Sequence, residues 1–109
     1  MKYIFEIKIK HGHSVEEYVK AWKKGSKIIQ QFPGARGTRL YQKIGEPNVL
    51  IAIADWKSKE ARDKAMVGID NITRLDLDTN KVVHAHRKYG RLFPLGGFDE
   101  IAKVAKNKS

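Results

Sequence analysis

Apolar and polar residues alternate over the first ten positions of the chain. Tyr3, Phe5, Ile7 and Ile9 fall on one side of an extended backbone, and mostly charged residues fall on the other. A period of two is typical of a strand with one buried face. The pattern therefore predicts a strand over residues 1–10.

The period changes after the connector "HGH" at residues 11–13. Ser14 is a good helix N-cap, and Glu17 follows three residues later, as in a capping box. Apolar residues then recur at helical spacing until Pro33 and Gly34, which break a helix. We expect the first helix between these signals.

Two further strands and a helix are predicted in the middle of the chain. Residues 35–44 read as a strand, and "GEPN" at 45–48 reads as a turn. The run "VLIAIADW" at 49–56 is almost continuously apolar, which predicts a central strand that is buried on both faces. Ser58 is then placed to cap a second helix over residues 59–66.

The C-terminal third of the pattern is less regular. Residues 67–80 predict a short helical extension followed by a loop, and residues 81–89 predict a fourth strand. The segment "LFPLGG" at 92–97 is interpreted as a loop. Asp99 can cap a last short helix over "EIAKVAKN" at 100–107.

The predicted order is strand, helix, strand, strand, helix, strand. This βαββαβ order is typical of an α+β ferredoxin-like domain, here spanning residues 1–109. It gives a four-stranded antiparallel sheet with two helices on one face, plus a C-terminal helical extension. Because residues 49–56 are apolar toward both faces, the other face also needs cover. A second copy docked sheet to sheet would form a dimeric α/β barrel, so we predict a homodimer.

The charge raises the question of anionic partners. Lys and Arg number 22 and Asp and Glu 12, a net charge of +10, which favours nucleic acid, an anionic ligand or an acidic protein. The basic residues are nevertheless spread along the chain, which argues against a nucleic-acid track. RNA-recognition modules share the βαββαβ order, but "VLIAIA" offers no aromatic ring on which a base could stack.

The absence of cysteine narrows the chemistry. No disulfide, thiolate zinc site or cysteine nucleophile is possible. The sequence has no apolar stretch of ~18 residues and nothing like a signal peptide. We therefore expect a cytoplasmic protein that does not enter a membrane.

The segments "YIFEIKIK" and "PGARGTRLY…VLIAIADWKSKEARD" resemble a known group of proteins. Trp56 at the end of a strand, Ser58 as a cap and Arg62 in the following helix carry much of the likeness. The chain resembles the dimeric α/β-barrel superfamily and, within it, the antibiotic biosynthesis monooxygenase group. It is most similar to the RedY-like proteins, such as HapK, of prodigiosin-type pigment biosynthesis.

This resemblance implies a homodimer with a ligand pocket between sheet and helices in each subunit. Members act without metal or flavin on aromatic polyketides, pyrroles or indoles, some as oxygenases and the RedY-like members in ring closure or coupling. A haem-degrading branch uses an asparagine on the first strand and a histidine on the second helix. "YIFEIKIK" and "KEARDKAM" contain neither residue, so no cofactor is expected.

The resemblance thus favours a small cofactor-independent enzyme that acts on a planar aromatic intermediate of pigment or antibiotic biosynthesis. A non-catalytic carrier or a ligand-sensing protein of the same fold remains the alternative. The two differ in whether a bound compound is chemically changed.

His84 and His86 are the candidate catalytic residues. On a strand, residues two apart point to the same side, and imidazole can accept and return a proton near neutral pH. A metal site would need a third ligand, from Glu6 or Asp55, and we assign no metal. The alternative is that both histidines are polar lining of the barrel.

Three aromatic residues are candidates for an apolar slot. Trp56 ends a buried strand, and Tyr18 and Trp22 lie one turn apart on the first helix. Flat rings at such positions can stack on a planar substrate. The alternative for each is ordinary core packing.

Arg62 and His13 complete the predicted substrate-binding residues. Arg62 could hold a carboxylate or stabilise an enolate, or it could be a surface residue. His13, with His11, could close over the mouth of the pocket, or the pair could belong to an exposed loop.

Overall fold

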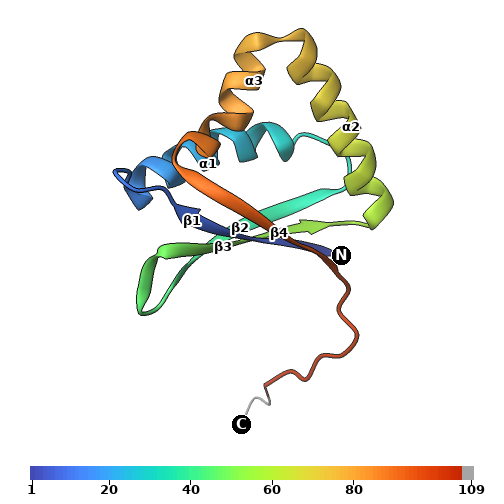
Figure 1. Cartoon of the computed structure of the whole chain (residues 1–109). Coiled ribbons are helices and arrows are strands. Elements are labelled where there is room, and N and C mark those ends of the chain that lie inside the picture. Colours follow the sequence, from blue (N-terminus) through green and yellow to red (C-terminus); the bar gives the residue numbers. More distant parts are fainter. Residues whose placement is uncertain (107–109) are drawn as a thin grey trace.

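The computed structural model describes residues 1–106, which form a four-stranded antiparallel sheet covered on one face by helices (Figure 1). The strands are β1 (Lys2–Ile9), β2 (Ala35–Lys43), β3 (Glu46–Trp56) and β4 (Gly90–Phe98). Their order in the sheet is β2-β3-β1-β4, and every neighbouring pair is antiparallel. The predicted ferredoxin-like α+β fold is therefore confirmed.

The helices of the described part lie on the same side of the sheet (Figure 1). They are α1 (Val15–Ile29), α2 (Lys59–Leu75), α3 (Leu77–His84) and a short 3-10 helix, η1 (Ala85–Lys88). Helices α2 and α3 meet at Asp76 and form a hairpin that rises above the sheet. The layer therefore contains one α-helix more than the two that the sequence predicted.

The predicted N-caps at Ser14 and Ser58 are present. The hydroxyl of Ser14 accepts a hydrogen bond from the Glu17 N–H at 3.1 Å, and the Glu17 carboxylate accepts one from the Ser14 N–H at 2.9 Å. This reciprocal pair is a capping box. Ser58 accepts from the Ala61 N–H at 3.1 Å and begins α2. Satisfying these otherwise unpaired N–H groups fixes where each helix starts.

The strand predicted over residues 81–89 is wrong, because this segment is helical. The carboxylate of Asp76 accepts hydrogen bonds from the N–H groups of Asp78 at 2.9 Å and Thr79 at 3.2 Å, which starts α3. Val83 is buried where α3 packs on α1. The β-branched pair in "KVVHAH" favours a strand by local propensity, but the cap and the packing determine the outcome.

The fourth strand is instead β4, which includes the segment that was interpreted as a loop. Leu92 lies opposite Ile7 of β1, and the register shifts by one residue further along the pair. Strand β4 is at the edge of the sheet, where Pro94 and glycines are tolerated because one side of the strand needs no partner. Proline and glycine therefore mark an irregular edge strand here.

The chain leaves the sheet after Phe98 and projects away from it (Figure 1). Residues 99–106 have no regular secondary structure, so the helix expected after Asp99 is not formed among them. The last position of that expected helix lies outside the described residues. None of the helices among residues 1–106 is both long and apolar enough to cross a membrane.

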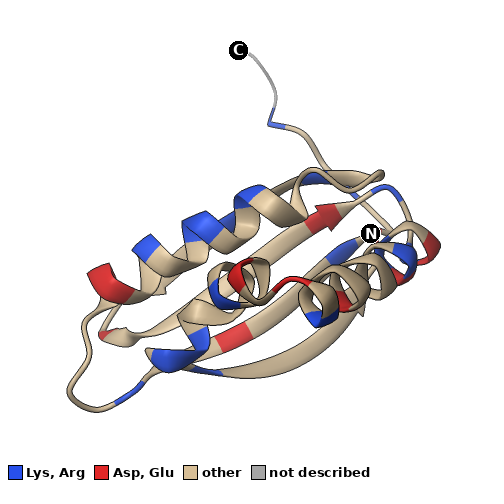
Figure 2. Cartoon of the chain, turned by 90° about the horizontal axis from the view of Figure 1, so that it is seen from above, with Lys and Arg blue, Asp and Glu red and all other residues tan. Residues whose placement is uncertain are grey.

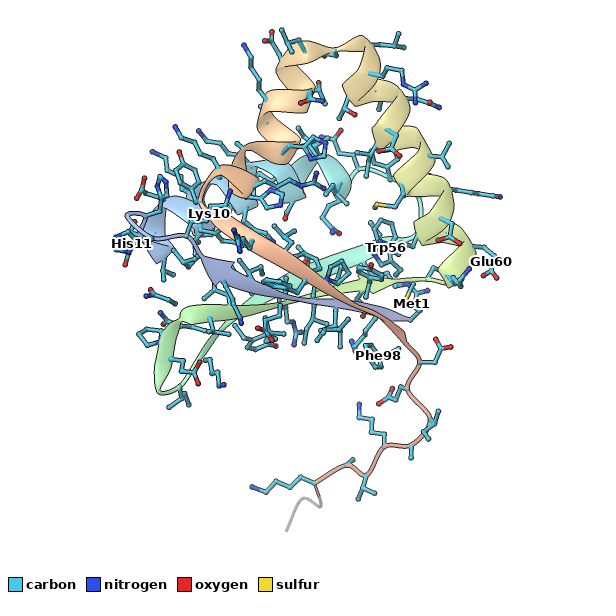
Figure 3. The ribbon with its side chains drawn as sticks, in the orientation of Figure 1. Met1, Lys10, His11, Trp56, Glu60 and Phe98 are labelled. Carbon is cyan, nitrogen blue, oxygen red and sulfur yellow. The ribbon has the colours of Figure 1, made fainter. Side chains whose placement is uncertain are left out.

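The main core lies between the sheet and the helices. Ile7, Tyr18, Leu50 and Ala52 are almost fully buried there and form one cluster. Alternate residues of the same strands face the other way, so the opposite face of the sheet also carries apolar side chains. Figure 3 shows Phe98 on that second face, on the side away from the helices.

Candidate functional site

A cavity of about 260 Å³ lies between the helix-covered face of the sheet and the helices. Strands β1, β2, β3 and β4 form its floor, and α1, α2, α3 and η1 form its walls. It is the space in which the resemblance places a ligand pocket. Its lining has an apolar part and a polar part.

Aromatic side chains dominate the apolar part. Tyr3 and Phe5 of β1, Trp22 of α1 and Trp56 of β3 line the cavity, together with Met66 and other aliphatic side chains. Trp56 is 2% exposed and lies on the helix side of the sheet at the end of β3 (Figure 3). The structure therefore places Trp22 where a flat ring system could stack on it, whereas Trp56 is almost wholly packed into the wall. Contact of either tryptophan with a substrate stays a prediction.

Both candidate histidines also line the cavity, although not as residues of a strand. His84 is the last residue of α3 and His86 belongs to η1. Residues two apart on a helix do not face the same way, so the expected parallel pair on a strand is wrong. The turn from α3 into η1 brings both rings to the cavity by another route.

Burial makes His86 a neutral imidazole. The pKa of His86 is lowered to about 4, chiefly by burial and further by the Arg87 charge. The Val83 carbonyl acts in the opposite direction and raises this pKa. The neighbouring His84 contributes least to this pKa. Removal from water, more than repulsion between the two histidines, therefore keeps the ring uncharged.

His84 lies less deep than His86. Burial and the Arg87 charge lower the pKa of His84, whereas the carboxylate of Asp70 raises it. Asp70 belongs to α2 and lines the same cavity. The pKa of His84 is therefore lowered overall, and the Asp70 carboxylate offsets this lowering only in part.

Several buried polar atoms of this region lack a protein partner. The Nδ1 atoms of His84 and His86 and the hydroxyl of Tyr18 are buried and form no hydrogen bond within residues 1–106. Buried polar groups are normally paired, so the histidine wall of the cavity holds polar atoms whose hydrogen-bonding capacity is unused.

Tyr18 and His13 do not line the cavity. Tyr18 is fully buried in the core, and its ring packs edge to face on His86 with centroids 5.6 Å apart. The His13 ring packs on Tyr89 at 5.1 Å, and its Nδ1 is 3.7 Å from the Glu17 carboxylate, longer than a hydrogen bond. The structure thus puts Tyr18 behind the histidine wall and His13 outside it.

His11 is exposed in the connector between β1 and α1. Figure 3 shows it beside Lys10, at the end of the sheet opposite Trp56. Neither histidine of this connector closes over the cavity in this structure. The exposed-loop interpretation of His11 fits its position.

Arg62 lines the cavity from α2. Its guanidinium carbon lies 3.5 Å from the centre of the Tyr3 ring, and its side chain is 22% exposed. Sequence reasoning missed Tyr3, Asp70 and Arg87 as lining residues. The helical spacing of Arg62, Met66 and Asp70 gives them one shared face, which the helical extension predicted after residue 66 could have revealed.

The residues do not form a metal site. Among residues 1–106, no three His, Asp or Glu side chains lie close enough together to hold a metal ion. Glu6 and Asp55 lie on the face of the sheet away from the cavity, because their neighbours Ile7 and Trp56 are buried on the helix side. Asp55 instead pairs with Lys2 at 3.4 Å. Neither carboxylate can complete a site with the two histidines.

Much of the positive charge lies away from the cavity. Figure 2 shows basic residues along α1 after its acidic first turn. They are exposed, as expected for lysines on the outer side of a surface helix: Lys20, Lys23, Lys24 and Lys27.

Comparisons with known proteins agree with this architecture. SnoaB, a cofactor-independent oxygenase from Streptomyces nogalater, superposes with a TM-score of 0.75 at 13% identity over 96% of both chains. A protein from Arabidopsis thaliana gives 0.67 at 11% identity, over 94% of this chain and 98% of its own. A conserved protein from Methanosarcina mazei gives 0.60 at 13% identity, over 87% and 89%. At these identities the likeness shows a shared fold.

A match to a family model shows the family of this chain, whereas the solved structures show only its fold. No curated protein matches the chain. The model of the antibiotic biosynthesis monooxygenase family matches residues 1–66 of the 109, from β1 into α2. The matched part includes both tryptophans and Arg62, and it ends before His84 and His86. Since the match spans more than half of the sequence, this chain belongs to the antibiotic biosynthesis monooxygenase family.

Proposed function

We propose that this protein is a cofactor-independent, monooxygenase-like enzyme of secondary-metabolite biosynthesis that acts on a planar aromatic intermediate. The observation that carries the proposal is the cavity, which joins an aromatic slot to two histidines whose Nδ1 atoms are unpaired. Family membership and the fold shared with a cofactor-independent oxygenase support it. A role in the cytoplasm fits the same proposal.

His84 is the better general base of the pair. A base works best when its pKa lies near the working pH, and the pKa of His86, about 4, is too low for that. His84 lies less deep and has Asp70 to stabilise its protonated form. His84 would take an acidic C–H or O–H proton from the substrate, while neutral His86 would hydrogen-bond to it.

The electron-rich anion left by this step has two possible fates. It can react with molecular oxygen, or its carbon can attack an electrophilic carbon of the same or a second molecule, as in the ring closure or coupling of RedY-like proteins such as HapK. We favour oxygenation because of the fold shared with SnoaB. Oxygen consumption distinguishes the two reactions.

A homodimer is part of the proposal. The second face of the sheet carries Ile4, Ile51 and Ile53 at neighbouring positions of β1 and β3. Aromatic side chains around them are about half exposed: Tyr41, Phe93 and Phe98. Apolar patches of this kind mark association surfaces, and a second copy would complete the barrel.

The test uses 1,8-dihydroxyanthrone, a flat tricyclic compound with an acidic CH₂ group. Each turnover would consume one O₂ and release one water, leaving the other oxygen atom as the new ring carbonyl. We expect the protein to accelerate oxygen uptake and His84→Gln to lower the rate about 100-fold or more. We expect a smaller loss from His86→Gln and none from the exposed control His11→Gln.

Two results would contradict the assignment. If both cavity variants keep the full rate, the histidines have no acid/base role. If the anthrone binds tightly but is recovered unchanged, the alternative of a carrier protein holds. Mass spectrometry of the recovered compound separates these results from oxidation.

A further inference from the structure

We infer that the ligand of this cavity is a planar aromatic compound that bears a carboxylate, and that Arg62 binds that group. The inference rests on the proposed aromatic-binding role of the cavity and adds the charge of the ligand and the place where it is recognised. Four features of the structure carry it.

The first feature is the way in which Arg62 is held. Its guanidinium lies over the Tyr3 ring at 3.5 Å, and both side chains line the cavity. Stacking on an aromatic face fixes the plane of a guanidinium and leaves its N–H edge free. The fork of donors is therefore positioned in advance for a planar anion.

The second feature is that Arg62 lacks an acceptor of its own. The nearest carboxylate is that of Asp63, whose Oδ1 is 3.8 Å from Nη1, beyond hydrogen-bond length. The other oxygen, Oδ2, accepts from Lys59 at 3.1 Å. No hydrogen bond from the guanidinium is present within residues 1–106, so a side chain with five donors is left largely unpaired in a partly buried place.

The third feature is the balance of charge around the cavity. Its lining holds two guanidinium groups, of Arg62 and Arg87, and one carboxylate, of Asp70. Asp70 is next to His84, whose pKa it raises. At the Arg62 end, Asp63 offsets the positive charge only in part, because it forms no hydrogen bond to Arg62 and pairs with Lys59. A ligand carboxylate would add a bidentate, charge-assisted pair.

The fourth feature is the distance between the two ends of the cavity. Arg62 and Asp70 are eight residues apart on α2, or about 12 Å along a helix. The histidines approach from α3 and η1, next to Asp70. A body of two or three fused rings fits this length, with its carboxylate at Arg62 and its reactive position near His84.

The test compares two probes of nearly equal shape, 2-naphthoate and its neutral amide 2-naphthamide, by isothermal titration calorimetry on the full chain. We expect the protein to bind the naphthoate roughly tenfold more tightly, as for one charge-assisted pair. Arg62→Gln removes this preference but keeps affinity for the amide. The matched control is Arg74→Gln, on the exposed side of the same helix, and it keeps both affinities.

The possible outcomes separate this inference from the proposed function. If the protein binds both probes equally, the inference is overturned and the aromatic slot stands. If it binds neither at millimolar concentration, the slot and the inference fall together. If Arg62→Gln loses both probes, Arg62→Lys decides, because it keeps the charge. A recovered preference for the naphthoate supports the inference, and equal binding overturns it.

Discussion

The two faces of the sheet are built by alternate residues of the same strands, but they are covered differently. On the helix side, Ile7, Leu50 and Ala52 are at most 1% exposed, and the helices leave a cavity over a different part of the sheet, at Tyr3 and Ala54. On the other side, no element of residues 1–106 covers the neighbouring Ile4 and Ile51. The difference supports the proposal that one face holds the ligand and that the other associates with a second copy.

The polar groups of the cavity come from helices, whereas the strands provide an apolar floor. Arg62 and Asp70 belong to α2, and His84 and His86 to the α3–η1 segment. On the open face, Glu6 lies among apolar side chains, opposite Ile51 and Phe93, and Lys2 pairs with Asp55 at 3.4 Å. The sheet can serve two surfaces because alternate residues of each strand face opposite sides.

The largest expected effect comes from a charge at the centre of the open face. Ile51→Asp would place a carboxylate directly opposite Glu6, which cannot pair with it, in the proposed interface of both copies. Breaking an interface with a buried unpaired charge costs about 3–5 kcal/mol, or roughly a thousandfold in affinity. We expect sedimentation velocity at micromolar concentration to show dimers for the natural protein and single chains for the variant.

The control for this prediction is a charge change on the helix side. Lys24→Glu, on the exposed side of α1, should leave sedimentation unchanged. Single chains of the natural protein at micromolar concentration would contradict the proposed dimer.

A pair of substitutions in β1 compares the two faces directly. Ile7 is fully buried under the helices, and Ile4 lies on the open face of the same strand. Ile7→Ala should lower the free energy of unfolding by about 2–5 kcal/mol, since it leaves a cavity in a packed core. Ile4→Ala should mainly weaken the dimer. Equal losses in urea unfolding, with no change in sedimentation, would remove the distinction between the faces.

The smallest expected effect is a pH dependence that arises on the helix side. Because the pKa of His86 falls to about 4 on folding, the unfolded chain binds this proton first as the pH falls. The folded state therefore loses stability between about pH 6.5 and pH 4. The His86→Gln variant has no titrating group at this position. Its free energy of unfolding should therefore fall by about 1–2 kcal/mol less over this window than that of the natural protein. This difference is reduced because water reaches part of the ring.

Urea unfolding at about pH 7 and about pH 4.5 measures this difference. His11→Gln, in an exposed position, should follow the natural protein at both values. A His86→Gln variant with the same pH dependence as the natural protein would show that the ring is not held neutral by burial.

The sequence predicted the fold well where local signals and packing agree. The capping box at Ser14, the cap at Ser58 and the strand period of residues 1–10 all correspond to real elements. The last third was less predictable because its signals conflict. The β-branched pair before His84 favours a strand, and the Pro and Gly residues of β4 favour a loop; tertiary contacts override both.

The cavity was predicted in part. Trp22, Trp56, Arg62 and the two histidines were named from residue type and resemblance, and all five line it. Asp70 was not named, although the helical extension predicted after residue 66 would place it on the same face as Arg62 and Met66. The neutral state of His86 could not be predicted, since its burial depends on how η1 packs.

Because α1 and α3 pack closely at Gly25, the size of the residue at this position determines the width of the cavity. A Cβ added to Gly25 would lie 3.0 Å from the Val83 carbonyl oxygen, so any larger residue would push the α3 backbone, and the imidazole rings it carries, outward. Related sequences with alanine or serine at this position would then have wider chambers. The range of substrates within this branch of the family could therefore change with the distance between α1 and α3, without a change in the other residues that line the cavity.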